Sequence, residues 1–323
     1  MDSRDYYNSF SGSVKREFSK TFEKSPLLQE NIVPCQICIK TVTIWLQIQK
    51  GRNDHEKAID RRRSERGAAG GQNVAAAAAP LTIDGTALEA SGSYLSNNTT
   101  YVPIRTVTEA LRPDAAVSWS DGQAVVSAWD LNLTARPGDL YIQANGRCLY
   151  VPDGVQVRSG RVLVPVRTLG AALGAQVDWD AATGSVSVTG GASVLTHADS
   201  YYNEDDLYWL SRIISAESRG ESLLGQIAVG NVVLNRAASA DFPNTIYSVI
   251  FDSRWGGQFE PVRNGTIYDA PAPSSIVAAK LCLEGANAVG DSLYFLAPAL
   301  TSNHWAMNQR TYVTTIGCHW FYR

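Results

Sequence analysis

The stretch Ile214-Ser215-Ala216-Glu217-Ser218-Arg219-Gly220-Glu221 closes a segment whose apolar residues have helical spacing. Leu210, Ile213 and Ile214 lie seven, four and three residues before Glu217, and in a helix these positions share one face. A carboxyl group on that face is costly to bury unless it is paired or protonated. Because desolvation raises the pKa of a carboxyl group, Glu217 is a candidate general acid. The alternative is an ordinary glutamate at a helix end that reaches solvent or a nearby arginine.

A second helix is predicted directly after this stretch. Gly220-Glu221-Ser222 ends the first helix and caps the next, which runs from Leu223 to Arg236. Its small residues Gly225, Ala228 and Gly230 would allow another helix to approach closely. The stretch therefore predicts two successive helices, with a break just after Glu217.

Six blocks carry a family resemblance, and they occur in the family's order. They are Glu217-Ser218-Arg219-Gly220-Glu221, Gly225-Gln226-Ile227-Ala228-Val229, Val233-Leu234-Asn235-Arg236, Phe242-Pro243-Asn244-Thr245-Ile246, Gln258-Phe259 and Ile316-Gly317-Cys318-His319. The region from about Tyr202 to the C-terminus resembles the spore-cortex-lytic (SleB/CwlJ-type) cell wall hydrolase family. Two departures are mild: Ser218 stands where alanine is usual, and Glu260 stands where serine or threonine is common.

The resemblance implies a lysozyme-like, mainly helical fold that acts on the glycan strands of peptidoglycan. It assigns the catalytic acid to the first glutamate of the motif, Glu217. A hydrolase would add a second carboxylate, for which Glu221, Asp252 and Glu260 are candidates. A lytic transglycosylase needs only one, because the C6 hydroxyl of the substrate attacks the anomeric carbon and leaves a 1,6-anhydro end. We expect the transglycosylase, and a non-catalytic wall-binding protein is the third hypothesis.

Five further residues are candidates for contact with the glycan. Gln258 offers an amide for N-acetyl groups, and Phe259 a ring for a sugar face. Tyr294, on a predicted strand, and Trp305 are further stacking candidates, and His319 could orient a neighbour of Glu217. For each aromatic ring the alternative is core packing, and for His319 it is a structural hydrogen bond.

Composition argues against several other classes of function. The four histidines show no metal-ligand spacing, and no glycine-rich phosphate loop precedes a helix, so neither a metal, a cofactor nor a nucleotide is expected. A formal net charge of −3 disfavours nucleic acid as a partner. The five cysteines, an odd and scattered set, do not form a disulfide framework. Cys35 and Cys38 are read as a chance pair, and the other three as buried apolar residues. We expect a monomer.

The chain of 323 residues divides into four segments. Residues 1–79 are predicted to be disordered, or to be a leader created by a wrongly assigned start. Residues 80–190 form an accessory domain, residues 191–201 a linker and residues 202–323 the catalytic domain. The predicted class is α+β, with a β-rich two-repeat domain before a mainly helical one. No clear signal peptide is present, so an extracellular or cell-envelope location is inferred from the substrate alone.

The accessory domain contains an internal repeat with a period of about 60 residues. Residues 101–111 match residues 163–173, and residues 116–120 match residues 176–180. Asp121-Gly122 predicts a two-residue hairpin turn. The repeat resembles the copper amine oxidase N-terminal-like domain, although its lack of histidine argues against copper. Arg105 and Arg167 either contact an anionic wall component or serve a structural role within each repeat. We predict a non-catalytic envelope-binding or spacing module.

Overall fold

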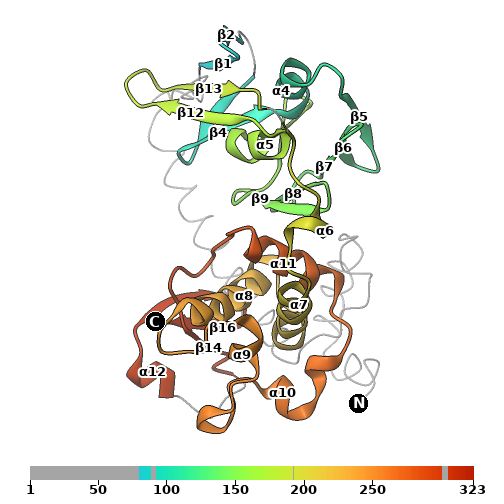
Figure 1. The fold of residues 1–323 in the computed structure, drawn as a ribbon. Coiled ribbons are helices and arrows are strands. Elements are labelled where there is room, and N and C mark those ends of the chain that lie inside the picture. Colours follow the sequence, from blue (N-terminus) through green and yellow to red (C-terminus); the bar gives the residue numbers. More distant parts are fainter. Residues whose placement is uncertain (1–79, 89–91, 192, 300–304) are drawn as a thin grey trace, which may run out of the picture. The chain divides into compact units, whose positions relative to one another are not determined.

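The computed structural model describes residues 80–88, 92–191, 193–299 and 305–323 (Figure 1). The predictions made for residues 1–79, including Cys35 and Cys38, lie outside this range. Within it the chain is mixed α+β, with a β-rich N-terminal region and a mainly helical C-terminal region, as predicted. Each region is described by itself.

Three sheets make up the β-rich region. Their strand orders are β12-β13-β1-β2, β10-β11-β4-β3 and β5-β6-β7-β8-β9, and β1 pairs with β13 in parallel. The strands are β1 (Leu81–Ile83), β2 (Thr86–Ala87), β3 (Tyr94–Ser96), β4 (Thr99–Pro103), β5 (Ala116–Ser120), β6 (Gln123–Ala128), β7 (Leu131–Ala135), β8 (Tyr141–Ala144), β9 (Arg147–Tyr150), β10 (Gln156–Arg158), β11 (Arg161–Pro165), β12 (Gln176–Asp180) and β13 (Ser185–Thr189). Helix α4 (Ile104–Leu111) follows β4, and helix α5 (Val166–Leu173) follows β11.

The predicted hairpin turn is present between β5 and β6. Asp121 and Gly122 both have positive φ, at 50° and 75°, as a tight two-residue turn requires. Arg105 pairs with Glu109 one helical turn away, and Arg167 donates a hydrogen bond to the Val177 carbonyl. Both arginines therefore make local contacts of the structural kind.

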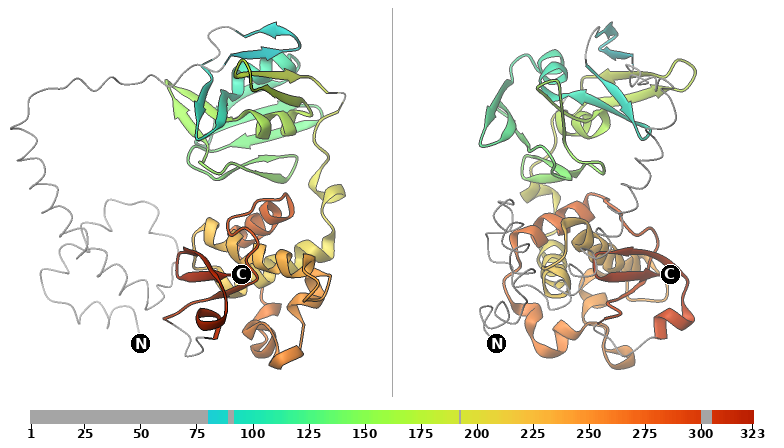
Figure 2. Two further views of the ribbon diagram at one scale, coloured as in Figure 1. Left: turned by 90° about the vertical axis from the view of Figure 1, so that its left-hand side faces the viewer. Right: turned by 180° about the vertical axis from the view of Figure 1, so that it is seen from behind.

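The C-terminal region consists of helices and one small sheet. The helices are α6 (Ala198–Tyr201), α7 (Glu204–Ser218), α8 (Leu223–Ala238), α9 (Ile246–Ile250), α10 (Glu260–Asn264), α11 (Pro273–Leu283) and α12 (Trp305–Gln309), with short 3-10 turns at η2 (Arg254–Gly256) and η3 (Thr266–Tyr268). Strands β14 (Tyr294–Leu296), β15 (Tyr312–Ile316) and β16 (His319–Tyr322) pair in the order β14-β16-β15. Helix α8 contacts β14 and β15, which appear in dark red in Figure 2.

Helix α7 presents Glu217 in its last turn. The Asn203 side chain caps its first turn by accepting a hydrogen bond from the Asp206 amide, and three acidic residues follow at this positive end of the helix dipole. The predicted apolar face of Leu210, Ile213 and Ile214 is fully buried. The helix ends at Ser218, and Ser222 caps α8, so the predicted break is confirmed.

Helices α7, α8 and α11 pack against one another (Figure 1). A β-carbon added to Gly230 would lie 2.7 Å from Cys282 Sγ on α11 and 2.8 Å from Ile214 Cδ1 on α7. Any larger residue would force one of these side chains to shift, which confirms the predicted close approach at Gly230. Close packing of α8 against α7 fixes the direction in which the end of α7 presents its side chains.

Polar side chains of α8 hold the loop that leads into the small sheet. Asn231 is buried, donates to the Ala286 carbonyl and accepts from the Ala288 amide. Asn235 donates to the carbonyls of Gly290 and Ser292. These contacts satisfy backbone groups of the loop, several of them buried, and so they position β14 beside α8.

Candidate active site

Glu217 is a half-buried carboxyl group at the end of α7. Among the described residues no side chain or backbone group forms a hydrogen bond or ion pair with its carboxyl group. Burial raises its pKa from 4.5 to about 7, and the charge of Arg236 opposes this rise. Glu217 therefore keeps its proton close to neutral pH while solvent still reaches it, and these are the properties of a general acid.

Arg236 is a buried cation whose charge acts on Glu217. Its Nε donates to the Leu293 carbonyl at 2.7 Å, and its Nη1 lies 3.4 Å from Gln258 Oε1. Its guanidinium also lies 5.1 to 5.6 Å from the ring centroids of Phe242, Phe259 and Tyr294. Burial lowers its pKa to about 10, so it remains charged at neutral pH. Arg236 thus connects α8 with β14 and with the segment that contains Gln258.

Glu221 accepts a hydrogen bond from the backbone, unlike Glu217. Both of its carboxylate oxygens accept from the Cys318 amide, at 3.4 and 3.3 Å. His319 Nδ1, which has no hydrogen-bond partner among the described residues, lies 3.9 Å from Glu221 Oε1. Burial lowers the pKa of His319, so this imidazole is neutral at pH 7. Glu221 thus fastens the turn between β15 and β16 to the start of α8.

The other two acidic candidates are each paired with an arginine. Asp252 has only 5% of its side chain exposed, and Arg254 binds both of its oxygens at 2.8 to 3.0 Å. Hydrogen bonds from Arg254 hold the pKa of Asp252 below its usual range. Glu260 is exposed and pairs with Arg263. Neither carboxylate is unpaired as Glu217 is.

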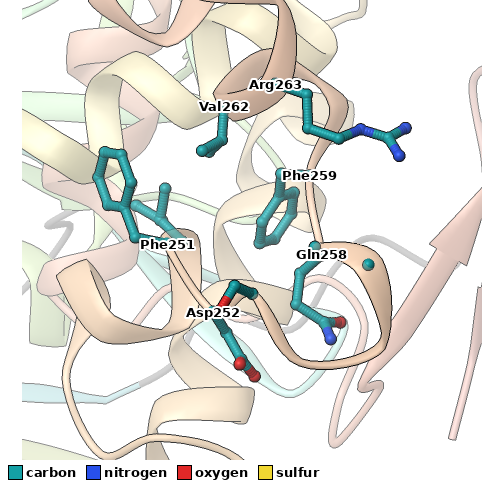
Figure 3. Close-up of a pocket in the computed structure, with 10 residues that line it drawn as sticks. Phe251, Asp252, Gln258, Phe259, Val262 and Arg263 are labelled. Atoms are coloured by element: carbon teal, nitrogen blue, oxygen red, sulfur yellow. The ribbon is translucent and has the colours of Figure 1, made fainter.

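A cavity of about 340 Å³ lies along the segment from Ile250 to Arg263 (Figure 3). In this view Asp252 and Gln258 direct their polar ends the same way, and Arg263 points away from the rings. Glu217 does not line this cavity, so the cavity and the candidate acid are separate features. Gln258 connects them, because it lines the cavity and contacts Arg236.

The candidate glycan contacts fall into two groups. Gln258 and Tyr294 are half-buried and Trp305 is 47% exposed, so each offers surface to a ligand. Phe259 is only 4% exposed and His319 only 8%, which leaves little of either ring for stacking on a sugar. The Tyr294 and Trp305 rings meet edge to face at 5.6 Å, whereas His319 packs against Phe295. The structure thus joins Gln258 and Tyr294 to Arg236, and Trp305 to Tyr294.

Arg236 and Arg310 contact the candidate site residues but were not given a role from the sequence. Arg236 follows Val232 and Val233 by four and three residues, so a charge on a buried helical face was visible in the sequence. Arg310, which contacts both Tyr294 and Trp305, had no such signal because its neighbours come from separate elements. Of the cysteines, Cys148 and Cys282 are buried as predicted, whereas Cys318 is half-buried.

Two further features are absent from the part of the chain that the structure describes. Within that part of the chain, no three histidine, cysteine or acidic side chains gather in a way that could hold a metal ion. None of the described helices is long and apolar enough to cross a membrane.

Two family models match the chain. Residues 220–322 match a model described as Cell Wall Hydrolase. The matched segment begins three residues after Glu217. Residues 71–188 match a model described as Copper amine oxidase N-terminal domain. Both matches agree with the resemblances stated from the motifs.

Curated relatives match the C-terminal region. A spore cortex-lytic enzyme of Bacillus cereus is 36% identical over 126 residues, which is 39% of this chain and 47% of that protein. The chain thus spans about half the length of that relative. The cell wall hydrolase CwlJ of Oceanobacillus iheyensis is 34% identical over 103 residues, which is 30% of this chain and 72% of that protein.

Among solved structures, the catalytic domain of the germination-specific lytic transglycosylase SleB from Bacillus anthracis is 36% identical. The match covers 38% of this chain and 97% of that domain, with a TM-score of 0.35.

Proposed function

We propose that this chain, which belongs to the cell wall hydrolase family, cleaves the glycan strands of peptidoglycan between MurNAc and GlcNAc. Glu217 is the general acid of this proposal. The observation that carries it is a half-buried carboxyl group, unpaired among the described residues, whose pKa burial raises to about 7. Such a group holds a proton at neutral pH and can give it to the departing glycosidic oxygen as the sugar becomes oxocarbenium-like.

The proposed reaction is that of a lytic transglycosylase. Glu217 protonates the oxygen that leaves with GlcNAc, and the bond from that oxygen to C1 of MurNAc breaks. The C6 hydroxyl of the same MurNAc forms the new bond to C1, and its proton returns to the Glu217 carboxylate. No water is consumed, so the product ends in a 1,6-anhydro ring and the enzyme regains its starting state.

The surroundings of the other acids support a mechanism with one carboxyl group. Glu221 binds the Cys318 amide, Asp252 is held on both oxygens by Arg254, and Glu260 pairs with Arg263. A hydrolase is the second candidate, favoured by one observation: Asp252 lines the cavity that also contains Gln258. In that mechanism Asp252 would activate a water molecule after parting from Arg254.

Mass spectrometry of the fragments released from purified peptidoglycan tests both candidates. Wild type is compared with Glu217→Gln, and Glu260→Gln serves as a control at an exposed acid. Anhydro ends that vanish only with Glu217→Gln support the transglycosylase, whereas reducing ends support the hydrolase. Full activity of Glu217→Gln, or no fragments from wild type, would refute the assignment of the acid or of the activity.

The related proteins include spore cortex-lytic enzymes, and so we extend the proposal to lysis of the spore cortex. This requires action outside the cell membrane, in the envelope. Activity on vegetative walls together with inactivity on purified cortex would refute the cortex role.

We also propose residues 80–190 as a non-catalytic module of two related halves that binds or spaces the enzyme at the wall. Both halves contain two strands, a helix and two further strands in this order. Residues 191–201 link it to a catalytic domain at 202–323. Pull-down of residues 80–190 with purified walls tests the binding role, which failure to sediment would contradict.

A further inference from the structure

Arg310 lies against two aromatic rings beside the candidate active site. Its guanidinium carbon is 4.6 Å from the ring centroid of Tyr294 and 4.8 Å from that of Trp305. Its Nη2 donates a hydrogen bond to the Tyr294 hydroxyl at 3.1 Å. Because stacking and this hydrogen bond restrain the guanidinium, its remaining N–H donors have a defined direction before any ligand binds.

The charge of Arg310 is not neutralised within the described part of the chain. Three other exposed arginines of the C-terminal region pair with acids: Arg254 with Asp252, Arg263 with Glu260 and Arg323 with Asp291. Arg310 is exposed and forms no ion pair with any described residue. An oriented guanidinium that no acid occupies is suited to bind a carboxylate through two parallel hydrogen bonds.

Tyr294 links Arg310 to the cation whose charge acts on the candidate acid. The same Tyr294 ring has the Arg236 guanidinium 5.6 Å from its centroid, and Arg236 acts electrostatically on Glu217. Arg236, Tyr294 and Arg310 therefore follow one another outward from Glu217. A sugar bound at Glu217 would bring its neighbouring substituents within reach of this series of side chains.

We propose that Arg310 binds a carboxylate of the muramic acid residue beside the scissile bond, and that it makes the enzyme prefer anionic glycan strands. This inference rests on the proposed function. The carboxylate has two possible sources: the lactyl group of a muramic acid without a peptide, or the peptide stem joined to that group. Both present the same planar anion to the guanidinium.

The test uses soluble glycan strands whose amino groups are first acetylated. One half of the sample keeps its carboxylates, and in the other half carbodiimide and methylamine convert them to neutral amides. A parallel pair is made from strands whose stems an amidase has removed, which leaves the lactyl carboxylate alone. Initial rates are compared for the full-length wild type, Arg310→Gln, Arg310→Lys and the control Arg323→Gln.

We expect amidation to reduce kcat/KM of wild type and Arg323→Gln about tenfold to a hundredfold, the range of a charge-assisted hydrogen bond. Arg310→Gln should cleave free and amidated strands at similar rates, and Arg310→Lys should recover part of the preference. If wild type prefers free over amidated carboxylates also in stem-free strands, Arg310 binds the lactyl carboxylate. If this preference occurs only in strands with stems, Arg310 binds a carboxylate of the peptide. Equal rates for wild type on free and amidated strands, or an unchanged preference in Arg310→Gln, would overturn the inference.

Binding separates this inference from the proposed activity. Affinities of Glu217→Gln and of Glu217→Gln/Arg310→Gln for free and amidated strands are measured by calorimetry. A preference for free strands that disappears with Arg310 supports the carboxylate site even if wild type cleaves nothing. Equal affinity of Glu217→Gln for both kinds of strand would overturn it even if cleavage is confirmed.

Discussion

Glu217→Gln should stabilise the folded protein in alkaline solution while it abolishes cleavage. The folded state raises the pKa of Glu217 from 4.5 to about 7, so folding favours the protonated carboxyl group. Between these two pH values the unfolded chain binds fewer protons than the folded one, and stability falls as the pH rises. Glutamine cannot ionise, so the variant does not have this loss.

The magnitude follows from the pKa change. Each pKa unit corresponds to about 1.4 kcal/mol, so ionised Glu217 destabilises the fold by at most about 3 kcal/mol. This is an upper value because solvent reaches part of the carboxyl group. The stability difference between Glu217→Gln and wild type should therefore grow from at most about 1 kcal/mol at pH 5 to at most about 3 kcal/mol at pH 8.5, levelling off above the folded-state pKa.

Urea unfolding followed by tryptophan fluorescence measures this difference at a series of pH values. The comparison between two variants at each pH cancels the titration of all other groups. Glu260→Gln is the control, because its exposed carboxylate pairs only with Arg263, and it should show no such trend. If the difference between Glu217→Gln and wild type is the same at pH 5 and pH 8.5, burial does not hold the proton on Glu217, and the physical basis for its role as an acid fails.

Two further substitutions test the frame around this acid. Gly230→Ala should lower the free energy of unfolding by about 1–2 kcal/mol despite the better helix propensity of alanine, because its β-carbon would overlap two side chains. The control Gly220→Ala should leave the free energy of unfolding unchanged, because no atom lies within 4 Å of the new carbon. Equal urea midpoints for the two variants would contradict the close packing at Gly230. Glu221→Ala should lower stability by about 1–3 kcal/mol, because it removes the carboxylate that accepts from the Cys318 amide, and activity should be lost only as the protein unfolds. A stably folded but inactive Glu221→Ala would instead make Glu221 catalytic.

Local sequence patterns predicted the elements that carry Glu217. The spacing of Leu210, Ile213 and Ile214 is a property of one helix, and the Ser222 cap depends on an amide only three residues away. The same reasoning extends to Arg236, whose charge follows two buried valines. Features that depend on contacts within about one helical turn could therefore be read from the sequence.

Long-range contacts decided what the sequence left open. Glu221 binds an amide 97 residues further along the chain, and nothing near it in the sequence points to that partner. Tyr294 lies on β14 and Arg310 just after α12, 16 residues further along the chain, so their stacking depends on the tertiary fold. The exposure of aromatic rings could not be predicted from the sequence either. Phe259 and Trp305 were both candidates for contact with the glycan, but tertiary packing leaves Phe259 4% exposed and Trp305 47% exposed.

Glu217 and Glu221 illustrate why one residue type serves two purposes four positions apart. An unbroken helix would carry both carboxylates on one face, where each would raise the pKa of the other and compete for the same partners. Helix α7 instead ends at Ser218, and Glu221 falls in the turn before α8, where it accepts from the Cys318 amide. This contact fixes the β15–β16 hairpin against α8 and leaves Glu217 without a competing acid beside it. The helix break thus separates a glutamate that binds a backbone amide from one whose proposed role as the acid requires an unpaired, protonated carboxyl group.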